Sequence, residues 1–130
     1  MDLMLVIISV WCSKIIFFSA VVAPTVFKTL EERDAGLFLR SFFPKYYNFG
    51  VMLGIIGLIV YFTASVYPAN ALLTLIIMTV LTVGGKLLIP VINNARDTYN
   101  ESAFKKYHLL SVAMNVLTLI VGIIFIVFSI

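Results

Sequence analysis

Two lysines stand inside segments that are otherwise almost wholly apolar. Lys14 lies in the first apolar run of the chain, and Lys86 follows two glycines in the third. An ammonium group at the centre of a membrane helix costs about 2.5–3.5 kcal/mol on insertion scales, so something must offset that cost. Snorkelling to the interface, loss of the proton, backbone carbonyls with water, or an anion brought by a ligand would each do so. For Lys86, snorkelling and a functional site are equal alternatives.

No acidic residue is placed to neutralise either lysine. The six acids all lie outside the apolar segments or at their ends: Asp2, Glu31, Glu32, Asp34, Asp97 and Glu101. The two ammonium groups would repel each other, so a site that they share would select strongly for an anion.

Further polar residues recur at helical spacing in the third and fourth apolar segments. Asn93 follows Lys86 by seven residues, which returns it to the same helical face. His108, Ser111 and Asn115 share a face at steps of three and four. Both faces lie in one half of the membrane, so we expect them to converge on one pocket. The predicted ligand-binding residues are Lys14, Lys86, Asn93, His108, Ser111 and Asn115.

The inventory of metal-binding side chains is short. His108 is the one histidine and Cys12 the one cysteine, which excludes a disulfide within the chain and any Cys-pair metal or redox motif. Nothing resembles a catalytic triad, a phosphate loop or paired carboxylates, so the sequence favours a protein that is not an enzyme. We predict no catalytic residue, no metal site and no cofactor. The alternative is a haem- or copper-related membrane enzyme or electron-transfer accessory with His108 as an axial ligand.

These residues are carried by a membrane protein. The chain has 130 residues, of which 62% are hydrophobic and 12% charged. A soluble domain has about a quarter charged residues, and a core of this small size cannot hold so many apolar side chains. We therefore predict a single transmembrane domain over residues 1–130. The net charge of +3 does not indicate nucleic-acid binding, because the basic residues are not clustered on a hydrated face.

Four segments are long enough to cross a bilayer core, which needs about 20 apolar residues. They are residues 3–27, 47–66, 71–92 and 107–130. The fold class predicted is therefore an all-α membrane protein, a bundle of four transmembrane helices. The first and third connections with their flanking helix ends hold seven Lys and Arg residues and the second holds none, which predicts that both termini face outward. The shared pocket would then face the cytoplasm.

The first connection carries an apolar pattern of its own. Leu37, Phe38, Phe42 and Phe43 fall near helical spacing. We expect a short amphipathic helix in the inner interface, ended by Pro44, between the first and second spans. The alternative is that this stretch extends the first span into the cytoplasm.

The second span carries glycines at steps of four and three. Gly50, Gly54 and Gly57 therefore share one helical face and let a neighbouring helix approach closely. We interpret them as helix-packing residues within the chain, with a homodimer seam as the alternative.

Several motifs recur in a fixed order along the chain. The stretch "VVAPTVFKTLEERDAGLFLRSFFPKYY" holds an A-P-x-x-F turn and a later F-P-x-Y segment, "IPVINNARD" follows, and "FKKYHLLSVAMN" fits F-x-x-x-H-x-x-S-x-x-x-N. This order resembles the uncharacterised bacterial membrane proteins related to human transmembrane protein 205. The further residues that carry the resemblance are Pro24, Phe27, Gly36, Phe43, Pro44, Tyr46, Pro90, Asp97 and Phe104. The resemblance implies a four-helix protein of the bacterial inner membrane without a settled activity.

The predicted function is to bind or permeate a small anionic or polar solute, or a lipid head group, through the cytoplasm-facing pocket. The two lysines would supply charge, and we expect Lys86→Met to stay folded but lose ligand binding. A structural subunit of a larger membrane complex is a further alternative. The expected partners are membrane lipids and either further copies of the chain or a larger complex, with no nucleic acid.

Overall fold

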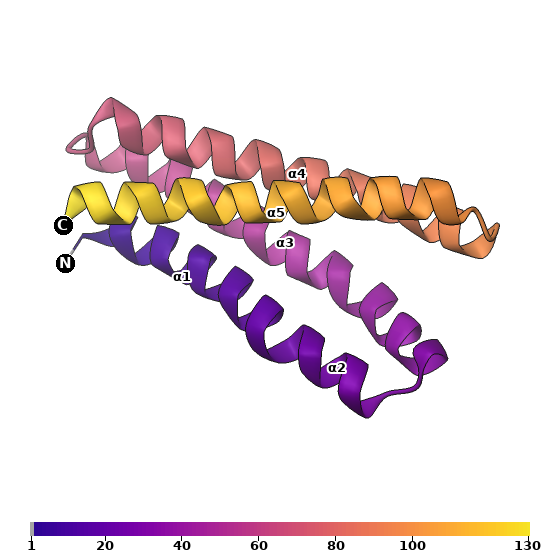
Figure 1. Cartoon of the computed structure of the whole chain (residues 1–130). Helices are drawn as coiled ribbons and strands as arrows, with labels where there is room; N and C mark the ends of the chain where they lie inside the picture. Colours follow the sequence, from indigo (N-terminus) through magenta and orange to yellow (C-terminus); the bar gives the residue numbers. More distant parts are fainter. Residues whose placement is uncertain (1) are drawn as a thin grey trace.

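The computed structural model describes residues 2–130, which fold into helices joined by short turns. The elements in chain order are α1 (Leu3–Phe17), a π-helical turn η1 (Phe18–Val22), α2 (Ala23–Thr29), α3 (Glu32–Ala64), α4 (Ala69–Asp97) and α5 (Glu101–Ser129). The first three follow one another without a break and form one rod. The four rods run up and down, with both termini at the same end of the bundle (Figure 1). We call this the terminal end and the opposite one the loop end.

All four rods are suited to a lipid environment. They are 27 to 33 residues long, and their most apolar stretches have mean hydropathies of 1.7 to 2.6. At a rise of 1.5 Å per residue they measure about 40–50 Å, whereas the hydrocarbon core of a bilayer is about 30 Å thick. The predicted bundle of four membrane-spanning helices is confirmed, the chain is an integral membrane protein, and the helix ends extend beyond the hydrocarbon.

The separate interfacial helix expected between the first two spans is not present. Helix α3 is continuous from Glu32 to Ala64 and includes Pro44, which was expected to end a helix. The expectation was wrong because a proline removes one backbone donor and strains one turn without forbidding the helix to continue. In membrane helices neighbouring groups satisfy the carbonyl that is freed. The apolar stretch before Pro44 therefore extends the second span rather than the first.

The first rod accommodates its proline differently. Pro24 has no N–H to donate, and the turn before it widens, so that the N–H of Ala23 donates to the carbonyl of Phe18, five residues earlier. The hydroxyl of Thr25 donates to the carbonyl of Val21 at 2.6 Å. The widened turn accommodates Pro24 at the start of α2, and the rod continues to the loop end.

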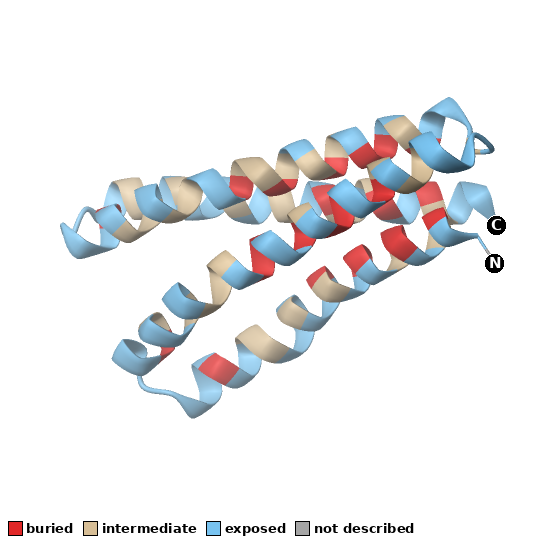
Figure 2. Cartoon of the chain, turned by 180° about the vertical axis from the view of Figure 1, so that it is seen from behind, coloured by how far each residue is buried: buried red, intermediate tan, exposed pale blue. Residues whose placement is uncertain are grey.

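The core is concentrated in the terminal half of the bundle. Figure 2 shows buried residues clustered there and few of them toward the loop end. The largest fully buried side chains are Trp11, Met4, Ile8, Leu75, Met78 and Thr118. Helix α1 packs against α5 in this half, whereas α2 and α5 diverge toward the loops (Figure 1). The bundle is therefore closed at one end and splayed at the other.

The three glycines of the second span lie inside the closed half. Gly50, Gly54 and Gly57 are buried in α3. A Cβ on Gly57 would lie 2.6 Å from a methyl group of Leu75 in α4, and one on Gly54 would meet Thr79 of the same helix. Their missing side chains set the close approach of α3 and α4.

Candidate functional site

The splayed half encloses a cavity of about 250 Å³ between α2, α3, α4 and α5. Its lining consists of Phe27, Gly36, Leu39, Arg40, Phe43, Ile89, Ile92, Asn93, Arg96, Phe104 and His108. Most of these side chains are apolar, and the polar ones approach from α3, α4 and α5. Such a mixture, mainly apolar with a few polar groups, is typical of small-molecule sites.

The cavity narrows toward the closed half. A recess of about 50 Å³ shares Phe43, Asn93 and His108 with it and adds Ser111 and Tyr47. The structure therefore brings together three of the predicted binding residues, one from α4 and two from α5. Their helical spacing was the signal that found them.

Lys14 lies deeper, in a separate polar cluster. Its Nζ donates to the backbone carbonyl of Tyr46 at 3.3 Å and lies 3.8 Å from the centroid of that tyrosine ring. The Tyr46 hydroxyl is 3.1 Å from Oδ1 and 2.9 Å from Nδ2 of Asn115. A carbonyl and the negative face of an aromatic ring both stabilise an ammonium group. Lys14 is thus compensated by neutral groups of α3, and Asn115 belongs to this cluster.

Lys86 does not join either group. It is exposed on α4, and it is not among the residues that line the cavity or the recess. Gly85 faces Tyr47 inside the bundle, and one further residue turns the helix by about 100°. The expectation that Lys86 and Asn93 share the pocket is corrected: Asn93 lines the cavity and the recess, whereas Lys86 lines neither, although its neighbours Gly85 and Ile89 line the recess.

At the loop end, Arg40 and Asp97 form a two-pronged ion pair. Nη2 of Arg40 lies 2.7 Å from Oδ1 of Asp97, and Nη1 lies 3.2 Å from Oδ2. Asp97 is the last residue of α4, and both side chains are exposed, so the pair lies at the loop end beyond the hydrocarbon. The guanidinium lowers the pKa of Asp97, chiefly through this hydrogen bond, and the carboxylate raises the pKa of Arg40. The charge of Arg40 is therefore already matched within the protein.

Arg96 has no ion-pair partner among residues 2–130. Its guanidinium lies 5.6 Å from the ring centroid of Phe104, which stacks on His108 with centroids 5.6 Å apart and planes 3° from parallel. A Cβ on Gly36 would lie 3.0 Å from Nη1 of Arg96, so a glycine there lets the guanidinium lie close to α3. Sequence reasoning counted Arg96 only toward membrane orientation. Its position three residues after Asn93, on the same face, was the available signal.

The residues that carry the family resemblance gather around the same half. The cavity is lined by four of them, Phe27, Gly36, Phe43 and Phe104. Tyr46 accepts a hydrogen bond from Lys14, and Asp97 pairs with Arg40. Of the prolines, Pro24 lies at the start of α2, and Pro44 and Pro90 lie inside α3 and α4. Within the described chain, no three His, Cys, Asp or Glu side chains are grouped closely enough to hold a metal ion.

Comparison with known proteins gives the chain a family. The family described as "Domain of unknown function (DUF4149)" matches residues 6–101. An uncharacterised protein of Aquifex aeolicus (strain VF5) is 31% identical over 104 residues, which cover 80% of this chain and 76% of that protein. No solved structure matches. The matched residues include all of α2, α3 and α4 and most of α1, and the chain therefore belongs to the DUF4149 family, a family of uncharacterised proteins.

Proposed function

We propose that this protein binds or permeates a small anionic or polar solute, or a lipid head group, in the cavity of the loop half. One observation carries the proposal. Arg96, a cation with no carboxylate partner in residues 2–130, lies over a cavity whose other polar lining includes Asn93 and His108. A guanidinium offers a planar fork of donors that fits a phosphate or carboxylate, and the asparagine amide can orient the bound group.

The surroundings strengthen such an interaction. Phe43, Ile89, Ile92 and Phe104 line the same cavity, so an anion held there would be partly shielded from water. Charge-assisted hydrogen bonds are stronger where the local dielectric is low. The closed half is tightly packed around the fully buried Trp11, so permeation would require that half to rearrange. Binding is therefore the simpler form of the proposal.

We place the loop end in the cytoplasm and the protein in a bacterial inner membrane. The support for the orientation is the count of seven Lys and Arg residues in and beside the two loop-end connections. The membrane assignment and a kinship with human transmembrane protein 205 rest on the order of the sequence motifs.

A thermal-shift experiment tests the proposal. The purified protein would be titrated with inorganic phosphate, small carboxylates and phospholipids, beside Arg96→Gln, Asn93→Leu and the exposed control Lys86→Met. A ligand at a hundred times its Kd stabilises a folded protein by about 2.7 kcal/mol. We expect a stabilising ligand for the wild type, the same response in Lys86→Met, and little response in the two cavity variants. Equal responses in all four proteins, or none in the wild type, would refute the proposal.

The haem or copper alternative keeps one supporting observation, because His108 lines the cavity. A Soret band, or copper in the purified protein by elemental analysis, would favour it over solute binding.

A further inference from the structure

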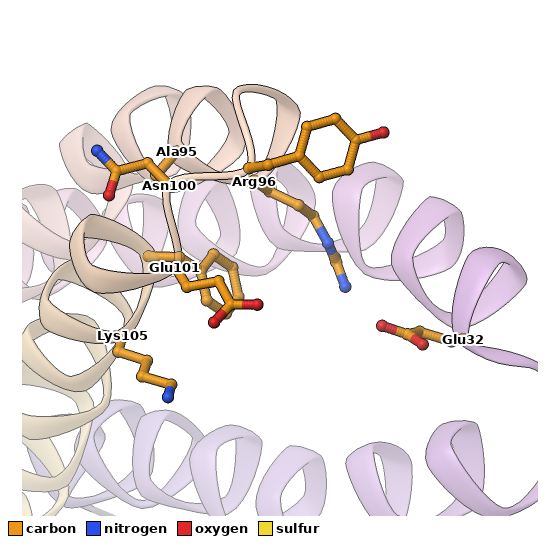
Figure 3. Close-up of a pocket in the computed structure, with 8 residues that line it drawn as sticks. Glu32, Ala95, Arg96, Asn100, Glu101 and Lys105 are labelled. Carbon is orange, nitrogen blue, oxygen red and sulfur yellow. The ribbon is translucent and has the colours of Figure 1, made fainter.

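The entrance of the splayed half carries both signs of charge. Figure 3 shows Glu32 of α3 on one side of an open space, facing Arg96, with Glu101 and Lys105 of α5 on the other side. This space has a volume of about 450 Å³. Within residues 2–130, no salt bridge joins any two of these four residues. Two acidic and two basic side chains therefore face one opening without neutralising each other by direct contact.

The entrance continues into the cavity described above. Arg96 and Phe104 line both spaces. Beyond them the walls are mainly apolar and include Phe27, Ile89 and Ile92. From the loop end inward, a ligand would meet charged groups of both signs, then a guanidinium beside an aromatic ring, then hydrocarbon. This order matches an amphiphile better than a uniformly polar solute.

The depth of these groups matches the layers of a bilayer. Ile89 lies eight residues before the end of α4 at Asp97, which is about 12 Å along the helix. Each head-group layer of a bilayer is about 5–8 Å thick. The charged entrance thus falls at head-group level and Ile89 at the edge of the hydrocarbon. Helices α2 and α5 diverge toward the loop end (Figure 1), and Phe27 of α2, which lines the cavity, is 65% exposed.

We propose that the ligand is a phospholipid whose head group carries both a phosphate and a primary amine, as in phosphatidylethanolamine. This inference rests on the proposed function and names its ligand class. Arg96 and Lys105 bind the phosphate, Glu32 and Glu101 accept hydrogen bonds from the ammonium group, and the roots of the acyl chains lie against Phe27 and the isoleucines. The lipid enters from its own leaflet between α2 and α5.

Charge complementarity distinguishes this lipid from its common alternatives. A purely anionic head group, such as phosphatidylglycerol, would satisfy the two cations and leave both carboxylates beside a like charge. A choline head group has the same net charge as ethanolamine, but it has no N–H group that could donate a hydrogen bond to a carboxylate. A free inorganic phosphate would leave the apolar walls without a partner. The amine and the acyl chains are therefore both part of the recognition.

Native mass spectrometry of the intact protein tests this directly. The protein would be reconstituted in nanodiscs of equal parts phosphatidylethanolamine, phosphatidylglycerol and phosphatidylcholine, and the retained lipid identified after release. We expect the wild type to retain phosphatidylethanolamine preferentially. Glu32→Gln with Glu101→Gln should lower its preference over phosphatidylglycerol about tenfold, which corresponds to about 1.4 kcal/mol. Arg96→Gln should reduce retention of all three lipids.

Lys106→Gln is the matched control, because it removes one positive charge beside Lys105 on a side chain that is exposed and lines neither space. It should retain lipids like the wild type, and melting temperatures would show that every variant is folded. A second arm offers free phosphoethanolamine and inorganic phosphate in detergent.

The outcomes separate the two proposals. In one outcome, the wild type retains phosphatidylglycerol at least as strongly as phosphatidylethanolamine, and Arg96→Gln loses this retention. That result would overturn the lipid assignment and leave the proposed function standing. Equally tight, Arg96-dependent binding of free phosphate would do the same. If no lipid or free anion binds in an Arg96-dependent way, both proposals fail.

Discussion

Gly84 and Gly85 are adjacent in α4, but the side chains that surround them differ. Substituting each one separately tests the packing at the inner end of the recess. A Cβ on Gly85 would lie 2.6 Å from Cε1 and 2.9 Å from Cζ and the hydroxyl oxygen of Tyr47. Tyr47 of α3 is 6% exposed and belongs to the buried core. A Cβ on Gly84 would meet the end of the Met114 side chain, with Cε and Sδ each at 3.2 Å.

The magnitudes follow from those neighbours. Replacing glycine by alanine inside a helix gains up to about 1 kcal/mol in helix propensity, and that gain is the same at both positions. Overpacking against a fixed ring costs about 1–3 kcal/mol. Met114 has three rotatable bonds and can move by a few tenths of an ångström. We expect Gly84→Ala to be neutral or slightly stabilising, and Gly85→Ala to be less stable than Gly84→Ala by about 1–3 kcal/mol.

Thermal melting and reversible unfolding in mild detergent would measure the difference. A double-mutant cycle with Tyr47→Ala isolates its cause, because removing the ring should abolish most of the penalty of Gly85→Ala. Equal stabilities of Gly84→Ala and Gly85→Ala would refute the close contact between α3 and α4. So would a penalty for Gly85→Ala that persists after the ring has been removed.

Three further variants test the polar groups. Lys14→Met should melt close to the wild type. The cost of placing the ammonium in the membrane is about 2.5–3.5 kcal/mol, and a charged hydrogen bond of about 1.5–3 kcal/mol with a cation–π contact of about 0.5–2 kcal/mol nearly balances it. A large loss in unfolding free energy would contradict this balance. Tyr46→Phe should lose about 1–3 kcal/mol in the same measurement, because it leaves the partly buried Asn115 amide without its partner, and an unchanged stability would contradict the contact. Because Arg40 lowers the pKa of Asp97, their contribution to stability is complete above the ordinary pKa of an aspartate and is lost as the pH falls through the lowered value. Melting temperatures measured from neutral to acidic pH should therefore fall more for the wild type than for Asp97→Asn, and parallel curves would show that the pair contributes nothing.

Much of the architecture was determined by the sequence alone. The four long apolar segments hold more apolar side chains than the core of a small soluble domain can bury, so the membrane bundle follows from composition and segment length. Helical spacing likewise predicted that His108 and Ser111 would line one pocket with Asn93, because the period of a helix fixes which residues share a face. Residues 47–66 belong to a longer helix than predicted. The prediction assumed that Pro44 ends a helix, as a proline does more often in soluble proteins than in membrane helices.

The periodicity of one helix does not say which neighbour each face meets, and the tertiary structure decided this for the charged residues. Lys86 and Asn93 are seven residues apart, yet Asn93 lines the cavity while Lys86 is exposed and lines neither the cavity nor the recess. Lys14 is held by the carbonyl and ring of Tyr46, a residue on another helix, and no local pattern encodes that contact. Arg40 is paired, while Arg96 has no ion-pair partner in residues 2–130, because the packing of α3 against α4 brings Asp97 to the first guanidinium and Gly36 to the second.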